Sequence, residues 1–448
     1  MAADLRAFLQ TLEAGNDLGR VEREVDTRHE IAAVLKKGAE EAAPAILFER
    51  VKGYQMPLVG NVLAARRRLA LCLGASEAEM LQRYREKIEN PLPPVPVDHG
   101  LAQEEFSDLS TLPLITAHEK DAGPYITAGV VIAAHSASGK VNLSLHRMHP
   151  IDQREAAIYV GATSDLSAYC KAAGDRPFPV TVAIGLHPAF LLVASTKFPE
   201  NVDELGLVGG LMGEGARMAP SRRGQNLLPE GAEIVLEGEI DFSRTVPEGP
   251  FGEYPGYYGG GSLQPRQSPV IRFHRMALRR DPVYQALITG PTTGYESMYF
   301  SCLSKEAMLY ALLSRISPAV CGVNVALSRY IAVVQVRGEL RQEEANLLMR
   351  EAFNHLEYLK YIVLVDEDVN RDDPVDVLWA LSTRVDPGIH LSVFPMIKME
   401  PLDPSTDGVC DKLGFDARRP TGAGGQGFLR TRIPGYEQTR LKDYLRQK

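Results

Sequence analysis

Two changes in hydrophobic pattern, near residues 100 and 300, restrict the folds open to this 448-residue chain. Before the first change, helical and strand-like segments alternate, which predicts a small α/β unit. The proline-rich stretch NPLPPVPVDHG (90–100) marks a boundary or a semi-rigid spacer. The middle third is mainly strand-like, and after the second change helices alternate with apolar, β-branched strands. We therefore expect three regions: 1–100, 101–300 and 301–448.

The middle region is expected to form an antiparallel barrel or sandwich with little helix. Residues 125–151, YITAGVVIAAHSASGKVNLSLHRMHPI, read as two strands joined by the turn SASGK. Three further segments have the same strand-like character: FPVTVAIGLHPAFLLVAS, AEIVLEGEI and QSPVIRFHRMALRR. Several antiparallel strands this close in sequence favour a barrel or sandwich.

The flanking regions carry most of the expected helices. At the N-terminus, apolar residues recur at helical spacing before Gly15, which predicts an amphipathic surface helix and not a secretory signal: Leu5, Phe8, Leu9 and Leu12. After residue 300, helices are expected at 304–316 and 341–356, and strands at 330–336 and 361–370. The chain ends in a glycine-rich loop and a basic helix that docks on a partner subunit or remains solvated.

Composition excludes two classes of partner. The net charge of −8 gives no basic face for the phosphates of a nucleic acid. No apolar run reaches the ~18 residues of a membrane-spanning helix. The five cysteines, an odd number without a CxxC pair, indicate reduced and mostly buried thiols. We therefore expect a cytoplasmic protein that binds neither nucleic acid nor membrane.

A loop with two acids is the first candidate for chemistry. The segment EGPFGEYPGYYGGG (248–261) holds two glutamates five positions apart, and it is too rich in glycine and proline for a helix. Such a loop can direct Glu248 and Glu253 into one cleft. A solvated turn that happens to carry acids is the commoner case, so the segment alone leaves both interpretations open.

A second polar segment, NLSLHRMHP (142–150), is expected on a strand. Strand alternation divides its side chains between two faces: Asn142, Ser144 and His146 on one, and Leu143, Leu145 and Arg147 on the other. An arginine on an apolar face must be paired or must hold an anion, unless it lies at the strand end and reaches solvent.

A third segment, STKFPENVDELGL (195–207), combines hydroxyls and acids ahead of the glycine-rich run GLVGGLMGEG. It could hold a phosphate and a divalent cation, or be an ordinary polar loop. Neither the GxGxxG nor the GxxxxGK[ST] nucleotide fingerprint is present.

Taken together, these segments resemble the UbiD-type family of prenylated-FMN-dependent (de)carboxylases. The resemblance covers most of the chain and follows the order GPYITAGVV, NLSLHR, VDELGLVGGLMG, EIVLEG, EGPFGEYPGYY and KLGFDARRP. It implies an α/β (α+β multidomain) fold: an N-terminal α/β region, a central split β-barrel that holds the prenylated flavin, and a C-terminal α/β domain whose terminal helix serves dimerisation. This agrees with the three regions expected from the pattern.

The resemblance also implies a catalytic set. The family's arginine falls on Arg147, and its two glutamates fall on Glu248 and Glu253. Arg147 can pair with Glu248 and hold the substrate carboxylate or tune the flavin. Loss of CO2 leaves negative charge on carbon, and Glu253 is expected to deliver the proton as general acid, or to accept it in the reverse reaction. The modified flavin supplies the electron sink.

The cofactor phosphate is held in this family through Mn²⁺ or Mg²⁺, with K⁺ beside it. The implied metal ligands here are Asn142 and Glu204, both oxygen donors. The position of the usual histidine is Asp165, which can bind the same ions, whereas a small gap would place Tyr159, a poor ligand, there. Contacts to the flavin or its phosphate are implied for Thr127, Asn142, Ser144, Leu145, Arg147, Ser195, Thr196 and Glu204.

The implied activity is that of a carboxy-lyase acting reversibly and without oxidation on an aromatic, heteroaromatic or α,β-unsaturated acid. The alternative, suggested by the missing histidine, is a flavin-binding, catalytically weak subunit of a larger carboxylase complex. Implied partners are the acid, CO2, a flavin prenyltransferase that supplies the cofactor, and further copies in a homodimer or hexamer. Residues 291–300 are expected in the pocket wall, where Glu296 would disfavour a second substrate carboxylate.

Overall fold

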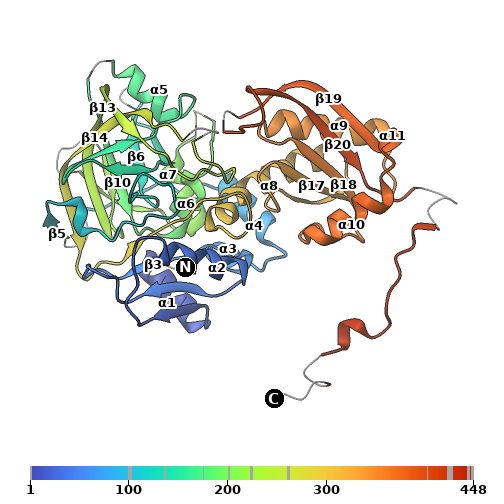
Figure 1. Ribbon diagram of the computed structural model, residues 1–448, viewed down its shortest axis with the longest axis horizontal. Coiled ribbons are helices and arrows are strands. Elements are labelled where there is room, and N and C mark those ends of the chain that lie inside the picture. The colour runs from blue at the N-terminus through green and yellow to red at the C-terminus, as the bar shows by residue number, and fades with distance from the viewer. Residues whose placement is uncertain are drawn as a thin grey trace.

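The computed structural model describes residues 3–98, 103–135, 138–174, 176–199, 202–221, 226–259, 263–400, 402–420, 427–440 and 444. In Figure 1 the N-terminal region packs below the large central sheet, and α8 (Glu296–Ile316) leads from there to a second sheet with its own helices. One buried apolar cluster runs through the N-terminal and central regions, and separate clusters form the core of the C-terminal region. The fold is mixed α/β, as predicted.

The N-terminal region is a small sheet with helices. Its helices are α1 (Leu5–Ala14), α2 (Glu30–Glu40), α3 (Arg66–Leu73) and α4 (Met80–Glu89). Its strands are β1 (Leu18–Val21), β2 (Ala45–Phe48) and β3 (Leu58–Gly60), joined by the distant β15 (Tyr284–Gln285). The helix expected at the N-terminus is confirmed: all four apolar residues of its pattern are buried, and the Asp4 carboxylate caps it by accepting from Ala7 N.

The central region is built on eight antiparallel strands. They lie in the order β7-β6-β10-β13-β14-β9-β8, and the eighth, β5, pairs with β14. Their bounds are β5 Gln103–Phe106, β6 Val130–Ala134, β7 Val141–Leu145, β8 Met148–Pro150, β9 Glu155–Ile158, β10 Phe178–Ile184, β13 Ile234–Glu248 and β14 Arg266–Arg279. No closed ring of strands forms within the described ranges, but a bridge between Ile126 and Met148 draws the two ends of the sheet together.

The central region also contains short elements that complete it. Three strands, β4 (Val95–Pro96), β11 (Arg217–Pro220) and β12 (Leu227–Pro229), form a small separate sheet, and a 3-10 turn, η1, spans Leu109–Thr111. The helices are α5 (Asp165–Ala172), α6 (Pro188–Ala194) and α7 (Glu204–Met212).

One of these helices, α6, corrects the sequence-based expectation, and another, α7, forms where no element was predicted. The segment 178–195 was expected to be strand-like throughout, but after β10 it turns into α6, where Pro188 occupies the first turn and His187 caps it. Most of the glycine-rich run, for which no element was predicted, lies in α7, which Asp203 caps. Its glycines permit close packing, because a Cβ at Gly209 or Gly210 would lie 2.3 Å from Leu92 O or 2.4 Å from Lys87 O, respectively.

The C-terminal region is a five-stranded sheet in the order β16-β17-β18-β20-β19. The strands are β16 (Val320–Asn324), β17 (Ile331–Val336), β18 (Tyr361–Asp366), β19 (Leu391–Lys398) and β20 (Val409–Asp416), and the helices are α9 (Gln342–His355), α10 (Pro374–Arg384) and α11 (Pro387–His390). The expected parallel pairing holds for β17, β18 and β20, while the two outer strands are antiparallel. Helix α8 begins at Glu296, ahead of the expected start at residue 304.

Arg430 still pairs with Asp376 of α10, and the described residues after it, up to 440, run away from the body of the molecule (Figure 1). This described segment holds only the short 3-10 turn η3 (Tyr436–Gln438). The expected glycine-rich loop at 421–426, part of the turn SASGK and most of the expected terminal basic helix lie outside the described residues. All five cysteines are unpaired and three are buried, as expected. None of the helices described has the length and apolar character needed to cross a bilayer.

Candidate functional site

The structure brings Arg147, Glu248 and Glu253 together. Arg147 lies in the short break between β7 and β8, and Glu248 is the last residue of β13. The Arg147 guanidinium donates from Nε to Glu248 Oε1 at 2.8 Å and from Nη2 to Oε2 at 3.0 Å, while Nη1 pairs with Glu253. The three side chains are only 7%, 0% and 5% exposed, so the alternative of a solvent-reaching arginine is wrong.

Aromatic rings enclose this arginine. The Arg147 Cζ lies 4.4 Å from the centroid of the Tyr159 ring and 4.7 Å from that of Phe251. Burial opposes the charge of Arg147, but the hydrogen bonds and charges of Glu248 and Glu253 outweigh it and raise the pKa of the guanidinium. Arg147 is therefore a permanent cation held between the carboxyl groups of Glu248 and Glu253.

The loop that carries Glu253 is anchored from the segment before β6. The Asp121 carboxylate accepts from Gly252 N and from His118 N, each at 2.8 Å. Gly252 has no room for a side chain, because a Cβ there would lie 2.3 Å from His118 Nδ1. On its other side, the carbonyl of Gly252 accepts from Thr289 Oγ1 at 3.1 Å. The glycine-rich turn is thus held in one conformation beside the arginine.

A cavity of about 280 Å³ opens next to the trio. It lies between the central sheet, the first turns of α8 and the loop after β19, which contributes Leu402. Its wall is mainly apolar and aromatic, with a few polar groups: Thr127, Leu145, His146, Arg147, Tyr159, Gly161, Ser164, Phe251, Glu253, Tyr254, Leu287, Thr289, Ser297, Phe300 and Leu402. A cavity of this composition suits a flat ring system held in place by few polar contacts.

Ser144 and His146 lie on the same face, as the strand pattern predicted. The Ser144 hydroxyl and His146 Nε2 are 3.0 Å apart, and His146 Nδ1 lies 2.9 Å from Tyr159 O. Burial lowers the pKa of His146 to about 4. The imidazole is therefore neutral at pH 7, with Nδ1 as the donor to the carbonyl and Nε2 as the acceptor.

Asn142 on β7 and Glu204 on α7 also meet. Asn142 Nδ2 lies 3.3 Å from Glu204 Oε2, which also accepts from Leu143 N at 2.5 Å. Burial, helped by the nearby charge of Asp165, raises the pKa of Glu204 to about 8. The amide oxygen of Asn142 is buried and has no hydrogen-bond partner among the described residues. An unpaired amide oxygen beside a buried carboxylate fits a hard cation such as Mg²⁺ or Mn²⁺.

The third expected ligand, Asp165, is paired with a lysine. Asp165 opens α5, and its carboxylate pairs with Lys197 Nζ at 3.6 Å. In the part of the chain that is described, no three His, Cys, Asp or Glu side chains are grouped as a metal site. Tyr159, the other position considered, has its ring on Arg147.

The remaining predicted contacts divide into two groups. Thr127 and Leu145 line the cavity, and the Thr127 hydroxyl accepts from Leu287 N at 3.1 Å. Ser195 and Thr196 do not line it. They end α6, and each hydroxyl donates to Leu192 O at 3.1 Å.

The segment expected in the pocket wall does contribute, but through other residues. Ser297 and Phe300 line the cavity, whereas Glu296 is directed away from it and accepts from Leu63 N at 2.6 Å. The expectation that Glu296 disfavours a second substrate carboxylate is therefore wrong. The Glu296 carboxylate is buried where it accepts from Leu63 N, and burial raises the pKa of Glu296 to about 7.

Sequence reasoning missed a contact between the C-terminal region and the acid loop. Arg329 donates to both carboxylate oxygens of Glu400, at 3.1 and 2.7 Å. Its guanidinium also lies 4.9 Å from the ring centroid of Tyr254, the residue after Glu253. Glu400 precedes the cavity residue Leu402 by two positions, so the pair links both walls of the cavity. No local motif could have shown this, because 71 residues separate the partners.

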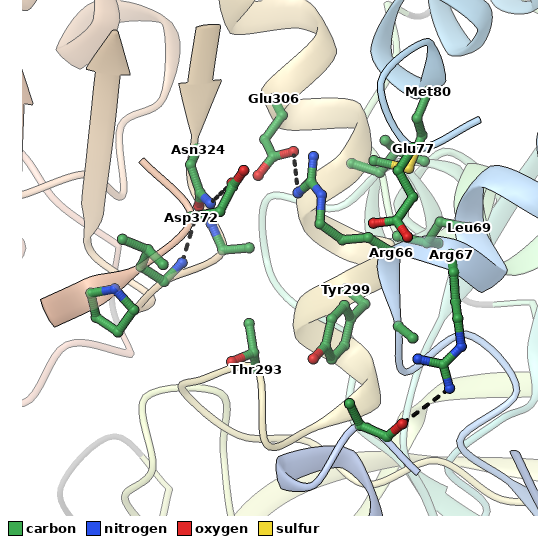
Figure 2. A pocket seen from close by; sticks show the side chains of 16 residues that line it. Arg66, Arg67, Leu69, Glu77, Met80, Thr293, Tyr299, Glu306, Asn324 and Asp372 are labelled. Atoms are coloured by element: carbon green, nitrogen blue, oxygen red, sulfur yellow. Dashed lines mark hydrogen bonds and ion pairs between the residues drawn. The ribbon is translucent and has the colours of Figure 1, made fainter. Parts of the chain in front are cut away.

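A second cavity, of about 290 Å³, lies where the N-terminal region, α8 and the C-terminal sheet meet. Figure 2 shows Arg66 reaching Glu306 across it, at 3.1 Å, and Asn324 paired with Asp372 at 2.5 Å. Glu306 also accepts from Val325 N at 3.2 Å. Of the residues expected in the pocket wall (291–300), Thr293 and Tyr299 line this second cavity instead, and the contact of Arg66 with Glu306 joins the N-terminal and C-terminal regions.

Comparisons with known proteins identify relatives along the whole chain. Three family models, for the N-terminal, Rift-related and C-terminal domains of 3-octaprenyl-4-hydroxybenzoate carboxy-lyase (UbiD), match residues 9–88, 89–292 and 298–417. The structure is similar to the UbiD-class enzyme HmfF from Pelotomaculum thermopropionicum in complex with FMN, with 33% identity and a TM-score of 0.90 over 99% of this chain and 100% of that one.

Two further solved structures add to this. An evolved dimeric form of HmfF in complex with prFMN has 32% identity and a TM-score of 0.87, over 99% of this chain and 100% of that one. The vanillic acid decarboxylase ShVdcCD of Sedimentibacter hydroxybenzoicus, in its open form, has 29% identity and a TM-score of 0.83, with 97% of each chain covered.

Proposed function

This chain belongs to the UbiD family, whose members are carboxy-lyases, and we propose that it decarboxylates an aromatic, heteroaromatic or α,β-unsaturated acid reversibly with prenylated FMN. The observation that carries this proposal is the buried contact of Arg147 with Glu248 and Glu253 at the edge of a ring-sized cavity. A guanidinium clamped by two acids beside such a cavity can hold a carboxylate and move a proton.

Arg147 and Glu248 act together in the proposed site. The forked pairing fixes the plane of the guanidinium, and the rings of Tyr159 and Phe251 hold it from its faces. The arginine then presents a fixed positive charge to the cavity, where it attracts the substrate carboxylate. Glu248, fully buried, serves to orient Arg147 and is the positioning partner of the pair.

Glu253 is the proposed proton carrier. When CO2 leaves, the bond between carboxyl carbon and substrate carbon breaks and its electron pair remains on the substrate. Glu253 then supplies the proton that forms the new C–H bond, and it recovers a proton from solvent afterwards. Glu253 is suited to this role because its side chain is buried and contacts both Arg147 and the cavity. In the carboxylation direction the same oxygen accepts the proton.

The cofactor is proposed to enter from the strand side of the cavity. Bound there, prenylated FMN would supply the electron sink for the pair left by CO2. Thr127, Leu145 and Arg147 line that side. Asn142 and Glu204 would hold Mn²⁺ or Mg²⁺ at the flavin phosphate, with Asp165 and K⁺ close by.

The test measures whether the protein binds prenylated flavin and whether it exchanges a ring hydrogen of a product arene for deuterium. The protein is co-produced with a flavin prenyltransferase, purified without oxygen, and examined by absorbance and metal analysis. Hydrogen–deuterium exchange into a panel of product arenes then reports proton transfer without net turnover. We expect bound prenylated flavin, and exchange that Glu253→Gln abolishes while flavin content stays. Glu119→Gln, an exposed acid near the loop, is the control.

Loaded flavin with no exchange on any arene or acid would contradict this proposal. It would favour the alternative of a flavin-binding, catalytically weak subunit. Exchange that survives in Glu253→Gln would show instead that another group carries the proton.

We also propose that the chain forms a homodimer or a hexamer through its C-terminal segment. Apolar side chains along this segment are exposed: Leu429 by 71%, Ile433 by 75% and Tyr436 by 68%. Large apolar groups on an extended arm favour burial against a second copy. Size-exclusion chromatography with light scattering should show a smaller particle after deletion of residues 427–448. An unchanged mass would exclude the arm as the interface.

A further inference from the structure

The second cavity, of about 290 Å³, is as large as the cavity beside Arg147 and has no part in the proposed reaction. Helix α8 contributes to the walls of both: Ser297 and Phe300 line the first cavity, whereas Tyr299 and Leu303 line the second. Residues of the N-terminal region and of the C-terminal sheet supply the rest of the second wall. A cavity of this size with polar groups in its wall can hold a small molecule.

One part of this wall is positively charged. Helix α3 begins there with Arg66, Arg67 and Arg68, and its first turn contains no acid. Cations are unfavourable at this end of a helix, because the first backbone N–H groups already carry partial positive charge. Among the described residues, two carboxylates bond the three guanidiniums: Asp17 accepts from the second and third, and Glu306 accepts from the first. The start of α3 therefore carries one more cation than it has bonded carboxylates.

Arg66 reaches into the cavity with hydrogen-bond donors that are not used (Figure 2). Its Nη1 donates to Glu306 Oε2 at 3.1 Å, while its Nε and Nη2 donate to none of the residues that the structure describes. The Arg66 side chain is 24% exposed, whereas that of Glu306 is only 1% exposed. The edge of the guanidinium formed by Nε and Nη2 therefore suits a ligand carboxylate, which a guanidinium binds through two parallel hydrogen bonds.

Two acids at the rim of the same cavity give it a second charge. Glu77 and Asp372 line the cavity, are exposed, and pair with no lysine or arginine in the described part of the chain. The Asp372 carboxylate accepts from Asn324 Nδ2 at 2.5 Å. A ligand ammonium group would find acceptors in both acids, whereas a phosphate dianion would be repelled by them. The mixed charges favour a neutral molecule that carries one charge of each sign.

We propose that this cavity binds a free α-amino acid with an apolar side chain, its carboxylate on Arg66 and its ammonium group at Glu77 and Asp372. The part of the wall that would receive the side chain is apolar: Leu69, Met80, Leu303, Ala326 and Leu327. The inference goes beyond the proposed decarboxylation and does not depend on it. Because the cavity lies where three regions meet, a bound amino acid should also stabilise the folded protein.

The experiment separates the two charges of the ligand. L-leucine is compared with 4-methylpentanoate, which lacks the ammonium group, and with 3-methylbutylamine, which lacks the carboxylate. L-methionine and L-phenylalanine extend the range of side chains. Isothermal titration calorimetry of the full-length protein gives the dissociation constants, and the melting temperature is measured with each compound. The variants are Arg66→Gln, Arg66→Lys and Glu77→Gln, with Glu339→Gln, an exposed acid that does not line the cavity, as matched control.

We expect wild-type protein to bind at least one of the three amino acids, to melt at a higher temperature with it, and to bind leucine more tightly than either partial compound. Arg66→Gln should weaken amino-acid binding about tenfold or more, through loss of a charge-assisted hydrogen bond, and Arg66→Lys should weaken it less. Glu77→Gln should weaken binding about twofold to fivefold, because this acid is exposed. Glu339→Gln should bind as wild type does.

Three results would overturn the inference. The first is no saturable binding of any of the three amino acids. The second is binding of 4-methylpentanoate as tight as that of leucine, which would make the cavity a simple anion site. The third is amino-acid binding that neither Arg66→Gln nor Glu77→Gln weakens, which would place the ligand elsewhere. If Arg66→Gln does not fold, Glu77→Gln decides the question, since Glu77 is exposed and pairs with no described cation.

Discussion

Replacing Asp121 by asparagine should lower activity without removing the flavin. Asp121 touches none of the proposed reacting groups, but its two carboxylate oxygens accept from Gly252 N and His118 N at 2.8 Å each. Asparagine keeps the size and one acceptor oxygen, and turns an NH2 group toward the other amide. One of these two backbone N–H groups then loses its partner, next to the residue that carries the proton.

The magnitude follows from that lost bond. Leaving a buried N–H group unpaired costs about 1–3 kcal/mol. If the loop shifts so that the N–H group finds another partner, Glu253 leaves its position beside Arg147. Restoring the catalytic position then costs the same free energy, which adds to the activation barrier. The expected fall in kcat/KM is therefore about 5-fold to 150-fold, converted at 1.4 kcal/mol per factor of ten.

The assay is steady-state decarboxylation by flavin-loaded protein, with the absorbance spectrum as a measure of loading. Asp108→Asn is the matched control, since Asp108 also accepts a backbone N–H at 2.8 Å, from Ser110, but at a turn outside the site. Activity of Asp121→Asn at the wild-type level would refute the anchoring argument. So would an equal loss in Asp108→Asn, or a loss explained entirely by missing flavin.

Three further predictions concern other parts of the site. Because the pKa of His146 is lowered to about 4 from an ordinary 6.5, the unfolded chain binds this proton more readily, and the free energy of unfolding should fall as pH drops through this window. Urea unfolding at pH 4 to 7 should show a smaller fall for His146→Gln than for wild-type protein, and an equal fall would contradict the argument. Arg329→Lys keeps the charge but loses the fork to Glu400, so kcat/KM should fall about tenfold; the same change at Arg337, an exposed surface pair, should be silent. Asn142→Ala should lower the Mn content and flavin content of purified protein together, and retention of both would exclude Asn142 as a ligand.

Local sequence patterns predicted a helix or strand correctly where its buried residues recur at one regular spacing. The spacing of Leu5, Phe8, Leu9 and Leu12 predicted α1, because a helix with one apolar stripe has only one way to bury it. The alternating segment around residues 141–145 predicted β7 and the shared face of Ser144 and His146 for the same reason. The order of the motifs led to the family and to the trio now found in contact.

Local patterns failed where distant packing decides the structure. The glycine content of the run GLVGGLMG disfavours a helix, yet most of it lies in α7, where a Cβ at Gly209 or Gly210 would clash with the backbone of residues 87–92. The apolar residues of α6 suit a strand or a helix equally, and Pro188 with its cap selects the helix.

The sequence by itself determined the family, the sequence of helix and strand in most regions, and the identities of Arg147, Glu248 and Glu253. Only the tertiary structure decided that Asp121 anchors the acid loop, that Glu296 turns away from the cavity, and that Ser297 faces it unpaired. These contacts join segments more than a hundred residues apart in the chain. Their strength depends on desolvation and geometry in the folded core, which no local pattern of residues encodes.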